Sequence, residues 1–318
     1  NFNEPVKPVD RKMAYKPLTL DILWWHRYHN SQNLDDLCLK DEETAIREAM
    51  CFKEAGGKTI VDLTNVSMSR DPLALARISK ATGLNIIMGT GYYHQNSYGK
   101  EMDDKKDEEI AEEIVQNILD GAGNTGIRSG IIGEIGCSEP LTDNELKVLR
   151  AAARAQRLTG ATINVHPAFG IRESPMRIIK LLSGMGVDTA RIIISHIDTT
   201  LRDSKDRILL AETGCYLEYD CFGREIGFRF KPKGDKLIET INDVQRTNEL
   251  KELIDKGFIS QLLISQDVAN KNNLRSYGGW GYAHILENVI PCMRMKGLTE
   301  EDLHAILVDN PRRFLTFA

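Results

Sequence analysis

The amino-acid sequence predicts an α/β fold, a (β/α)8 TIM barrel whose first strand is missing from the N-terminus of the printed chain. Seven short runs rich in Ile, Val and Leu alternate with amphipathic helical patterns, which is typical of a parallel sheet covered by helices. Several of these runs end on a polar side chain, and such ends are spread along the whole chain. An open doubly wound sheet is the competing fold. The barrel is preferred because it brings all its strand ends to one mouth.

Local signals place each element. Helix 43–57 ends on a glycine, helix 71–83 begins with Asp-Pro, and helix 142–160 opens with Thr142 and Glu145 as a capping box. Apolar residues at three-to-four spacing predict further helices at 107–122, 174–186 and 249–257. The strands are predicted at 58–64, 84–90, 129–136, 161–166, 190–196, 215–220 and 260–267.

The first 40 residues give no clear strand. The segment LDILWWHRYHN (20–30) reads as a helix or a capping loop, so residues 1–40 are expected to form an N-terminal loop and helix segment. We expect residues 1–318 to form a single barrel domain, with the first strand lying upstream of Asn1.

Composition narrows the class of function. The chain has 318 residues, 42% of them hydrophobic, and a net charge of −5 without a basic patch, which argues against nucleic acid as a partner. No apolar run approaches the roughly 18 residues that span a bilayer. Six cysteines without CxxC spacing favour reduced thiols and a cytoplasmic protein. The expected partner is a small-molecule substrate, and a homodimer is left open.

Four polar residues end apolar runs and are of the types that bind divalent metal: Glu134, His166, His196 and Asp267. Imidazole nitrogens suit Zn²⁺, Mn²⁺ or Fe²⁺, and a carboxylate can bridge two cations. A single histidine at a strand end is more often a satisfied core residue, but four such residues in succession predict one shared site. Two cations there would lower the pKa of a shared water and polarise the substrate oxygen.

Longer motifs carry a family resemblance. The segments IIGEIGCSEPLT, INVHP, ISHID, GCYLEYDCFG, YGGWGYAHIL and DNPRRFLTF together resemble the phosphotriesterase-related proteins, in the phosphotriesterase family of the amidohydrolase superfamily. The similarity runs from residue 40 to the end. It implies a (β/α)8 barrel with two divalent ions, zinc foremost and manganese or iron as alternatives. It also implies that Glu134 bridges the ions, that His166 and His196 bind the second, and that Asp267 binds the first.

The sequence departs from that family at two points. The family's His-x-His pair of the first strand has no match, because His26 and His29 are three apart and lie on a predicted helix. A chain that truly lacks the pair should bind metal poorly and be inactive, unless the pair precedes Asn1. Cys221 stands where the related lactonases have an arginine, which weakens a lactonase assignment.

Other strand ends are expected to line a substrate pocket. Tyr93 matches a tyrosine that approaches the metals in related lactonases, whereas His94 is expected in a solvated loop. Cys221, Arg224 and Trp280 are the other candidate substrate contacts. Basic residues gather in the loop 221–240, where a cation could hold an anionic tail of the substrate: Arg224, Arg229, Lys231, Lys233 and Lys236.

The resemblance implies hydrolysis by a metal-bridging hydroxide, with Asp267 accepting its proton and passing it to the leaving group. The expected substrates are small anionic N-acyl compounds such as N-acetyltaurine. Two alternatives stay open. One is a lactonase or esterase with promiscuous phosphotriesterase activity, and the other is a non-catalytic barrel that binds a small ligand.

Overall fold

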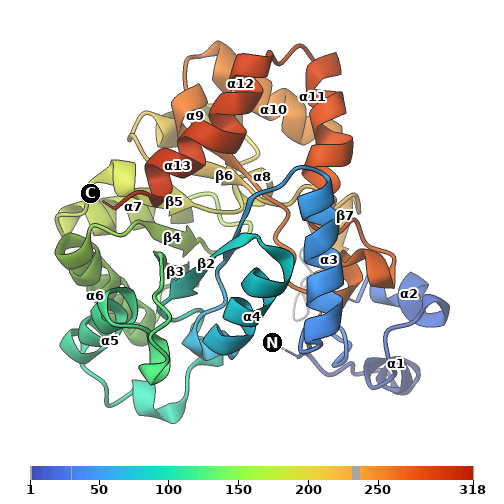
Figure 1. Cartoon of the computed structure of the whole chain (residues 1–318), viewed down its shortest axis with the longest axis horizontal. Helices are drawn as coiled ribbons and strands as arrows, with labels where there is room; N and C mark the ends of the chain where they lie inside the picture. Colours follow the sequence, from blue (N-terminus) through green and yellow to red (C-terminus); the bar gives the residue numbers. More distant parts are fainter. Residues whose placement is uncertain (1, 30, 231–236, 318) are drawn as a thin grey trace.

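The structure is a computed structural model and describes residues 2–29, 31–230 and 237–317. Its main feature is a sheet of seven parallel strands in the order β1-β2-β3-β4-β5-β6-β9, surrounded by helices (Figure 1). The strand bounds are β1 Thr59–Asp62, β2 Asn85–Thr90, β3 Ile131–Gly136, β4 Ile163–His166, β5 Ile192–Ile194, β6 Tyr216–Tyr219 and β9 Leu262–Ile264. All seven predicted strands are present, each shorter by one to five residues at its ends.

The sheet curls as a partial barrel, which confirms the predicted fold class. Each strand pairs with the next in parallel register, for example Ile163 with Ile192 and Leu217 with Leu262. Within the described residues, β1 and β9 are the two edges, and no strand pairs with both to close the barrel.

The predicted helices are confirmed with shifted ends, and several others were not predicted. α10 begins six residues earlier than expected because Asn242 and Gln245 form a capping box there. The antiparallel hairpin of β7 (Phe228–Phe230) and β8 (Leu237–Glu239) was not predicted, nor were α8, α9 and α11–α13. The helix bounds are α1 Pro8–Ala14, α2 Leu20–His26, α3 Glu42–Glu54, α4 Pro72–Thr82, α5 Asp107–Leu119, α6 Asp143–Thr159, α7 Ser174–Gly184, α8 Ile197–Thr200, α9 Ser204–Ala211, α10 Asp243–Asp255, α11 Ile290–Met295, α12 Glu300–His304 and α13 Asn310–Leu315. None of the described helices is long and apolar enough to cross a membrane.

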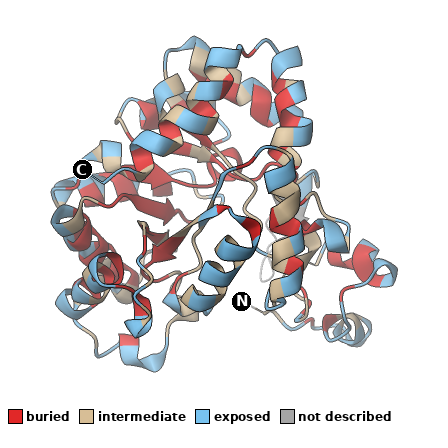
Figure 2. Cartoon of the chain, viewed as in Figure 1, coloured by how far each residue is buried: buried red, intermediate tan, exposed pale blue. Residues whose placement is uncertain are grey.

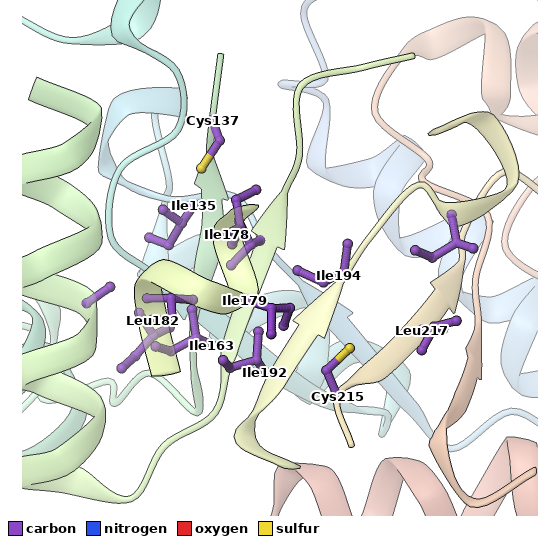
Figure 3. Packing of buried hydrophobic residues seen from close by; sticks show 14 of the residues in the cluster. Ile135, Cys137, Ile163, Ile178, Ile179, Leu182, Ile192, Ile194, Cys215 and Leu217 are labelled. Atoms are coloured by element: carbon purple, nitrogen blue, oxygen red, sulfur yellow. The ribbon is translucent and has the colours of Figure 1, made fainter. Parts of the chain in front are cut away.

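The main core lies between the outer face of the sheet and its covering helices. Burial is concentrated in the strands and on the sheet-facing sides of the helices (Figure 2). Ile163 of β4 and Ile192 of β5 pack with Ile178, Ile179 and Leu182 of α7 (Figure 3), and all five are buried. Fully burying each such side chain contributes about 1.5–3 kcal/mol.

The inner face of the sheet is layered from apolar to polar. Near the amino ends of the strands, Ile131, Ile193 and Leu263 form a second apolar cluster. There the ring of Tyr216 lies 5.2 Å from that of Phe314 in α13. Because side chains alternate along a strand, positions two and four residues further along also face inwards. On β6 and after β9 these positions are polar, namely Glu218, Asp220, Ser265 and Asp267, so the carboxyl end of the barrel holds the candidate site.

Candidate metal centre

Three donor atoms from three neighbouring strands converge on one point. The Nδ1 atom of His166 and the Nε2 atom of His196 each lie 3.1 Å from Oε1 of Glu134. The two ring nitrogens are 2.6 Å apart. Glu134 comes from β3, His166 is the last residue of β4, and His196 follows β5. The structure thus brings together three of the four residues that the sequence singled out for metal binding.

Asp220 fixes the orientation of the His196 ring. Its carboxylate lies 2.8 Å from Nδ1 of His196 and accepts a hydrogen bond of 3.1 Å from the backbone N–H of the same residue. Burial alone would lower the pKa of His196, but the Asp220 carboxylate outweighs burial and raises that pKa well above its ordinary value. With Nδ1–H directed at Asp220, Nε2 is the His196 nitrogen that faces Glu134 and His166, and a cation would bind there in place of the Nε2 proton.

His166 is neutral at pH 7. Burial and the neighbouring His196 lower the pKa of His166 to about 4. Burial would raise the pKa of Glu134, but the two histidines outweigh it and lower that pKa below its ordinary value. A neutral imidazole beside an ionised carboxylate is the protonation state in which both groups bind metal.

Asp267 follows β9 and lies close to His196. A donor atom from each of His196, Cys221 and Asp267 lies within 4.8 Å of the other two. Arg224 donates to the Asp267 carbonyl at 2.7 Å and also pairs with its carboxylate. Burial raises the pKa of Asp267 to about 6, although Arg224 lowers it. Arg224 is therefore engaged with Asp267.

Two of these strand ends have unusual backbone conformations. His196 has φ of +56° and Asp267 has φ of +44°, values that non-glycine residues adopt rarely. In His196 this conformation interrupts the alternation of the strand, so that its side chain follows that of Ser195 to the inner face. Strained residues of this kind cluster at functional sites.

The loop after β2 adds two aromatic rings to the centre. The hydroxyl of Tyr93 lies 3.3 Å from Nδ1 of His166, so it approaches the point where the donors meet. The expectation that His94 sits in a solvated loop is wrong. Its ring packs edge-on against His166 with centroids 4.7 Å apart, and Nδ1 is 3.7 Å from Glu145. Glu145 holds this loop because it also accepts from the backbone N–H of Gln95.

The other predicted substrate contacts lie around the same mouth. Cys221 is buried, with its thiol 3.4 Å from Asp220. Trp280 packs on Gly223, where an added Cβ would lie 2.4 Å from the indole ring. Gln266 donates to the carbonyls of Gly281 and Tyr282, so it anchors the glycine-rich loop that contains Trp280.

Two further groups of residues from the sequence analysis do not join the centre in the described structure. His26 is 3.2 Å from Asp36, with both side chains fully buried, and His29 stacks on Trp25, so these residues do not supply the missing pair. Of the basic residues in the loop 221–240, Lys231, Lys233 and Lys236 lie outside the described residues, as does the side chain of Arg229.

Sequence reasoning missed two residues that support the donors. Asp220 is the last residue of the predicted strand 215–220, and this position at a strand end was the sequence signal that could have identified it as a site residue. Asn65 is fully buried and donates to the carbonyl of Glu134 at 2.8 Å. A side chain that bonds to a distant carbonyl leaves no periodic pattern in the sequence, so nothing there indicated this contact.

The donor set fits a divalent cation. Two imidazole nitrogens 2.6 Å apart would oppose their lone pairs unless a proton or a cation lies between them. Two nitrogens and a carboxylate oxygen are ligands that zinc, manganese and iron share. Glu134, His166 and His196 would hold one ion, and Asp267 would face a second. The described residues contain no His-x-His pair beside Asp267.

A curled parallel sheet with two imidazoles and a carboxylate meeting at its carboxyl end is the architecture of a barrel hydrolase that uses metal. The model of the phosphotriesterase family matches residues 14–315. The N-acetyltaurine hydrolase of Dictyostelium discoideum is 42% identical over 292 residues, which cover 92% of this chain and 78% of that protein. The N-acetyltaurine hydrolase of Bos taurus is 38% identical over 315 residues, which cover 98% of this chain and 89% of that protein.

The same likeness extends to a solved structure. A resiniferatoxin-binding protein from Rhodobacter sphaeroides superimposes with a TM-score of 0.94 at 34% identity, covering 99% of this chain and 86% of that chain. The chain therefore belongs to the phosphotriesterase family and is a hydrolase of that family.

Proposed function

We propose that this protein is a metal-dependent amidohydrolase, with zinc as the preferred ion, that cleaves small anionic N-acyl compounds such as N-acetyltaurine. The observation that carries the proposal is the convergence of Glu134 Oε1, His166 Nδ1 and His196 Nε2 within 2.6–3.1 Å of one another. Two bound cations would lower the pKa of water and polarise the carbonyl that is attacked.

The chain's own residues then divide the work. Asp220 orients the His196 ring so that Nε2 faces the reaction centre, and Glu134 and His166 complete the donor set. Asp267 accepts the proton of the attacking water and delivers it to the leaving amine. The pKa of about 6 that burial gives to Asp267 suits a group that must both accept and release a proton near pH 7.

The proposed substrate class rests on charge and on the relatives. Two relatives that match almost the whole chain are named N-acetyltaurine hydrolases. N-Acetyltaurine carries a sulfonate, and Arg224 lies at the mouth with its guanidinium beside Asp267. A planar guanidinium can hold such an oxyanion. The free cysteines of the described residues favour a cytoplasmic enzyme, and a homodimer stays open.

A second candidate function is binding without turnover. The structural likeness to a protein named for binding resiniferatoxin supports it. A binder would hold a small ligand at the same mouth and leave it unchanged.

Turnover of defined substrates separates these proposals. The purified protein, with zinc or manganese added, is incubated with N-acetyltaurine, other N-acetyl amino acids and a panel of lactones. We expect release of acetate from the N-acetyl compounds in preference to lactone opening. Ligand binding without any product would favour the binder, and preferred lactone opening would favour a lactonase.

The Asp267→Asn variant tests the mechanism. It should lower kcat by about 10²–10⁴ while the fold is retained, because it removes the general base but keeps the side-chain shape. Asp309→Asn, at a partly exposed carboxylate on the helical surface, is the matched control and should keep full activity. Full activity in the Asp267→Asn variant would disprove this role for Asp267.

A further inference from the structure

A carboxylate inside the barrel links three strand ends but touches none of the four candidate ligands. Glu218 lies on β6 between Tyr216, in the inner apolar layer, and Asp220, which holds His196. The alternation of the strand therefore points all three side chains inwards. Glu218 occupies the middle layer, directly below the candidate metal centre.

Glu218 accepts hydrogen bonds from three other strand segments. Its Oε2 atom accepts from the amide of Asn164 at 3.0 Å and from the hydroxyl of Ser195 at 2.9 Å. Its Oε1 atom accepts from the hydroxyl of Ser265 at 3.1 Å. Ser195 is also 3.2 Å from the side-chain oxygen of Asn164, which closes the network.

Each partner of Glu218 stands one or two residues before a candidate ligand. Asn164 lies two residues before His166, Ser195 one residue before His196, and Ser265 two residues before Asp267. A shift of one strand end by about 1 Å would misplace its donor, and such misplacement costs on the order of 100-fold in enzymes. One carboxylate thus reaches the three strand segments that supply His166, His196 and Asp267. It does not reach β3, which supplies Glu134.

Packing alone does not account for an acidic residue at this position. Barrel interiors are usually filled by branched apolar side chains, and a carboxylate there is unfavourable unless it is hydrogen-bonded. Burial, together with the nearby Asp220, raises the pKa of Glu218 to about 7. Glutamine is therefore a fair mimic of its protonated form.

We propose that Glu218 is a positioning residue that holds the strand ends bearing His166, His196 and Asp267 in the register that a divalent cation requires. It sets metal affinity without touching the metal. This inference rests on the proposed metal centre.

Zinc affinity, measured by competition with a chromogenic chelator, tests the inference. Glu218→Leu keeps the side-chain size and removes all three hydrogen bonds, so its zinc affinity should fall by about 10–100-fold. Glu218→Gln keeps an acceptor for Asn164 and Ser195, and its affinity should stay within about threefold of wild type. Ser265→Ala removes a single contact and should fall between them, which keeps the test usable if the leucine variant does not fold.

Glu252→Leu is the matched control. Glu252 is a partly buried carboxylate on α10, 3.1 Å from Arg207, and it also accepts a hydrogen bond from Ser204, so both of these partners lie on α9. The Glu252→Leu variant should have a lower melting temperature and unchanged zinc affinity. Rescue by glutamine, with no effect of the control, separates positioning from a general loss of stability.

The inference and the metal centre fail in different ways. Wild-type zinc affinity in Glu218→Leu and Ser265→Ala would overturn the role of Glu218 and leave the metal centre standing. Undiminished zinc binding by the His166→Ala and His196→Ala variants would instead overturn the metal centre, and the inference with it.

Discussion

Asp220 offers the sharpest test of how the candidate centre is built. Its carboxylate accepts from both the ring and the backbone N–H of His196, at 2.8 and 3.1 Å, and it is buried. Asp220→Asn keeps the shape of the side chain but replaces one acceptor oxygen with an NH₂ group. One of the two contacts with His196 must then be lost or reversed.

The magnitude follows from that lost contact. A hydrogen bond to a charged group contributes about 1.5–3 kcal/mol. This corresponds to about a 10–100-fold change in an equilibrium constant, the range that is usual for carboxylates that orient metal-binding histidines. We therefore expect the zinc affinity of Asp220→Asn to be about 10–100-fold weaker than that of wild type.

The assay is zinc competition with a chelator, together with thermal unfolding of the metal-free proteins. Asp309 provides a matched control, because it also lies near a histidine (His304 at 3.7 Å) but on the exposed surface. Asp309→Asn should bind zinc as wild type does. Wild-type affinity in Asp220→Asn would refute the view that Asp220 directs the His196 ring.

Three further predictions concern other parts of the fold. Burial would raise the pKa of Glu145, but His94 and Ser138 outweigh it and lower that pKa from 4.5 to about 2. The extra stability of wild type over Glu145→Gln should therefore be complete above about pH 4.5 and should disappear as the pH falls towards 2. Urea unfolding at several pH values measures this difference, and a difference that does not change with pH would contradict the prediction. Gly223→Ala should destabilise the protein by about 1–3 kcal/mol, seen as a lower melting temperature, because φ is +92° and the new Cβ meets Trp280. With free zinc at 100 times its Kd, the free energy of unfolding should be about 2.7 kcal/mol higher than without zinc. If the His166→Ala variant lost the same amount of stability when zinc was removed, the site would be contradicted.

The sequence predicted the buried strands well, and it singled out three residues that the structure brings together. Runs such as IIGEIG and IIIS are rich in isoleucine, and a polar residue in or after such a run is conspicuous, which is why the sequence pointed to Glu134, His166 and His196. The family and the fold class are likewise confirmed. The start of α10 was missed because its capping box lies in a polar stretch without apolar periodicity.

The supporting network was harder to predict for a physical reason. Glu218 alternates with Tyr216 and Asp220, so its inward direction could have been inferred from CYLEYD. Its partners Asn164, Ser195 and Ser265 lie on other strands, and only the curvature of the sheet brings them together. His94 was misjudged for the same reason, because a loop that folds back over the barrel has no sequence period.

Anomalous X-ray scattering from zinc-soaked crystals tests the central claim most directly. The account predicts a zinc peak about 2.0–2.1 Å from both Nδ1 of His166 and Nε2 of His196, with the Glu134 carboxylate beside it. Zinc density that is absent from this point, or present only at surface histidines such as His304, would contradict the account.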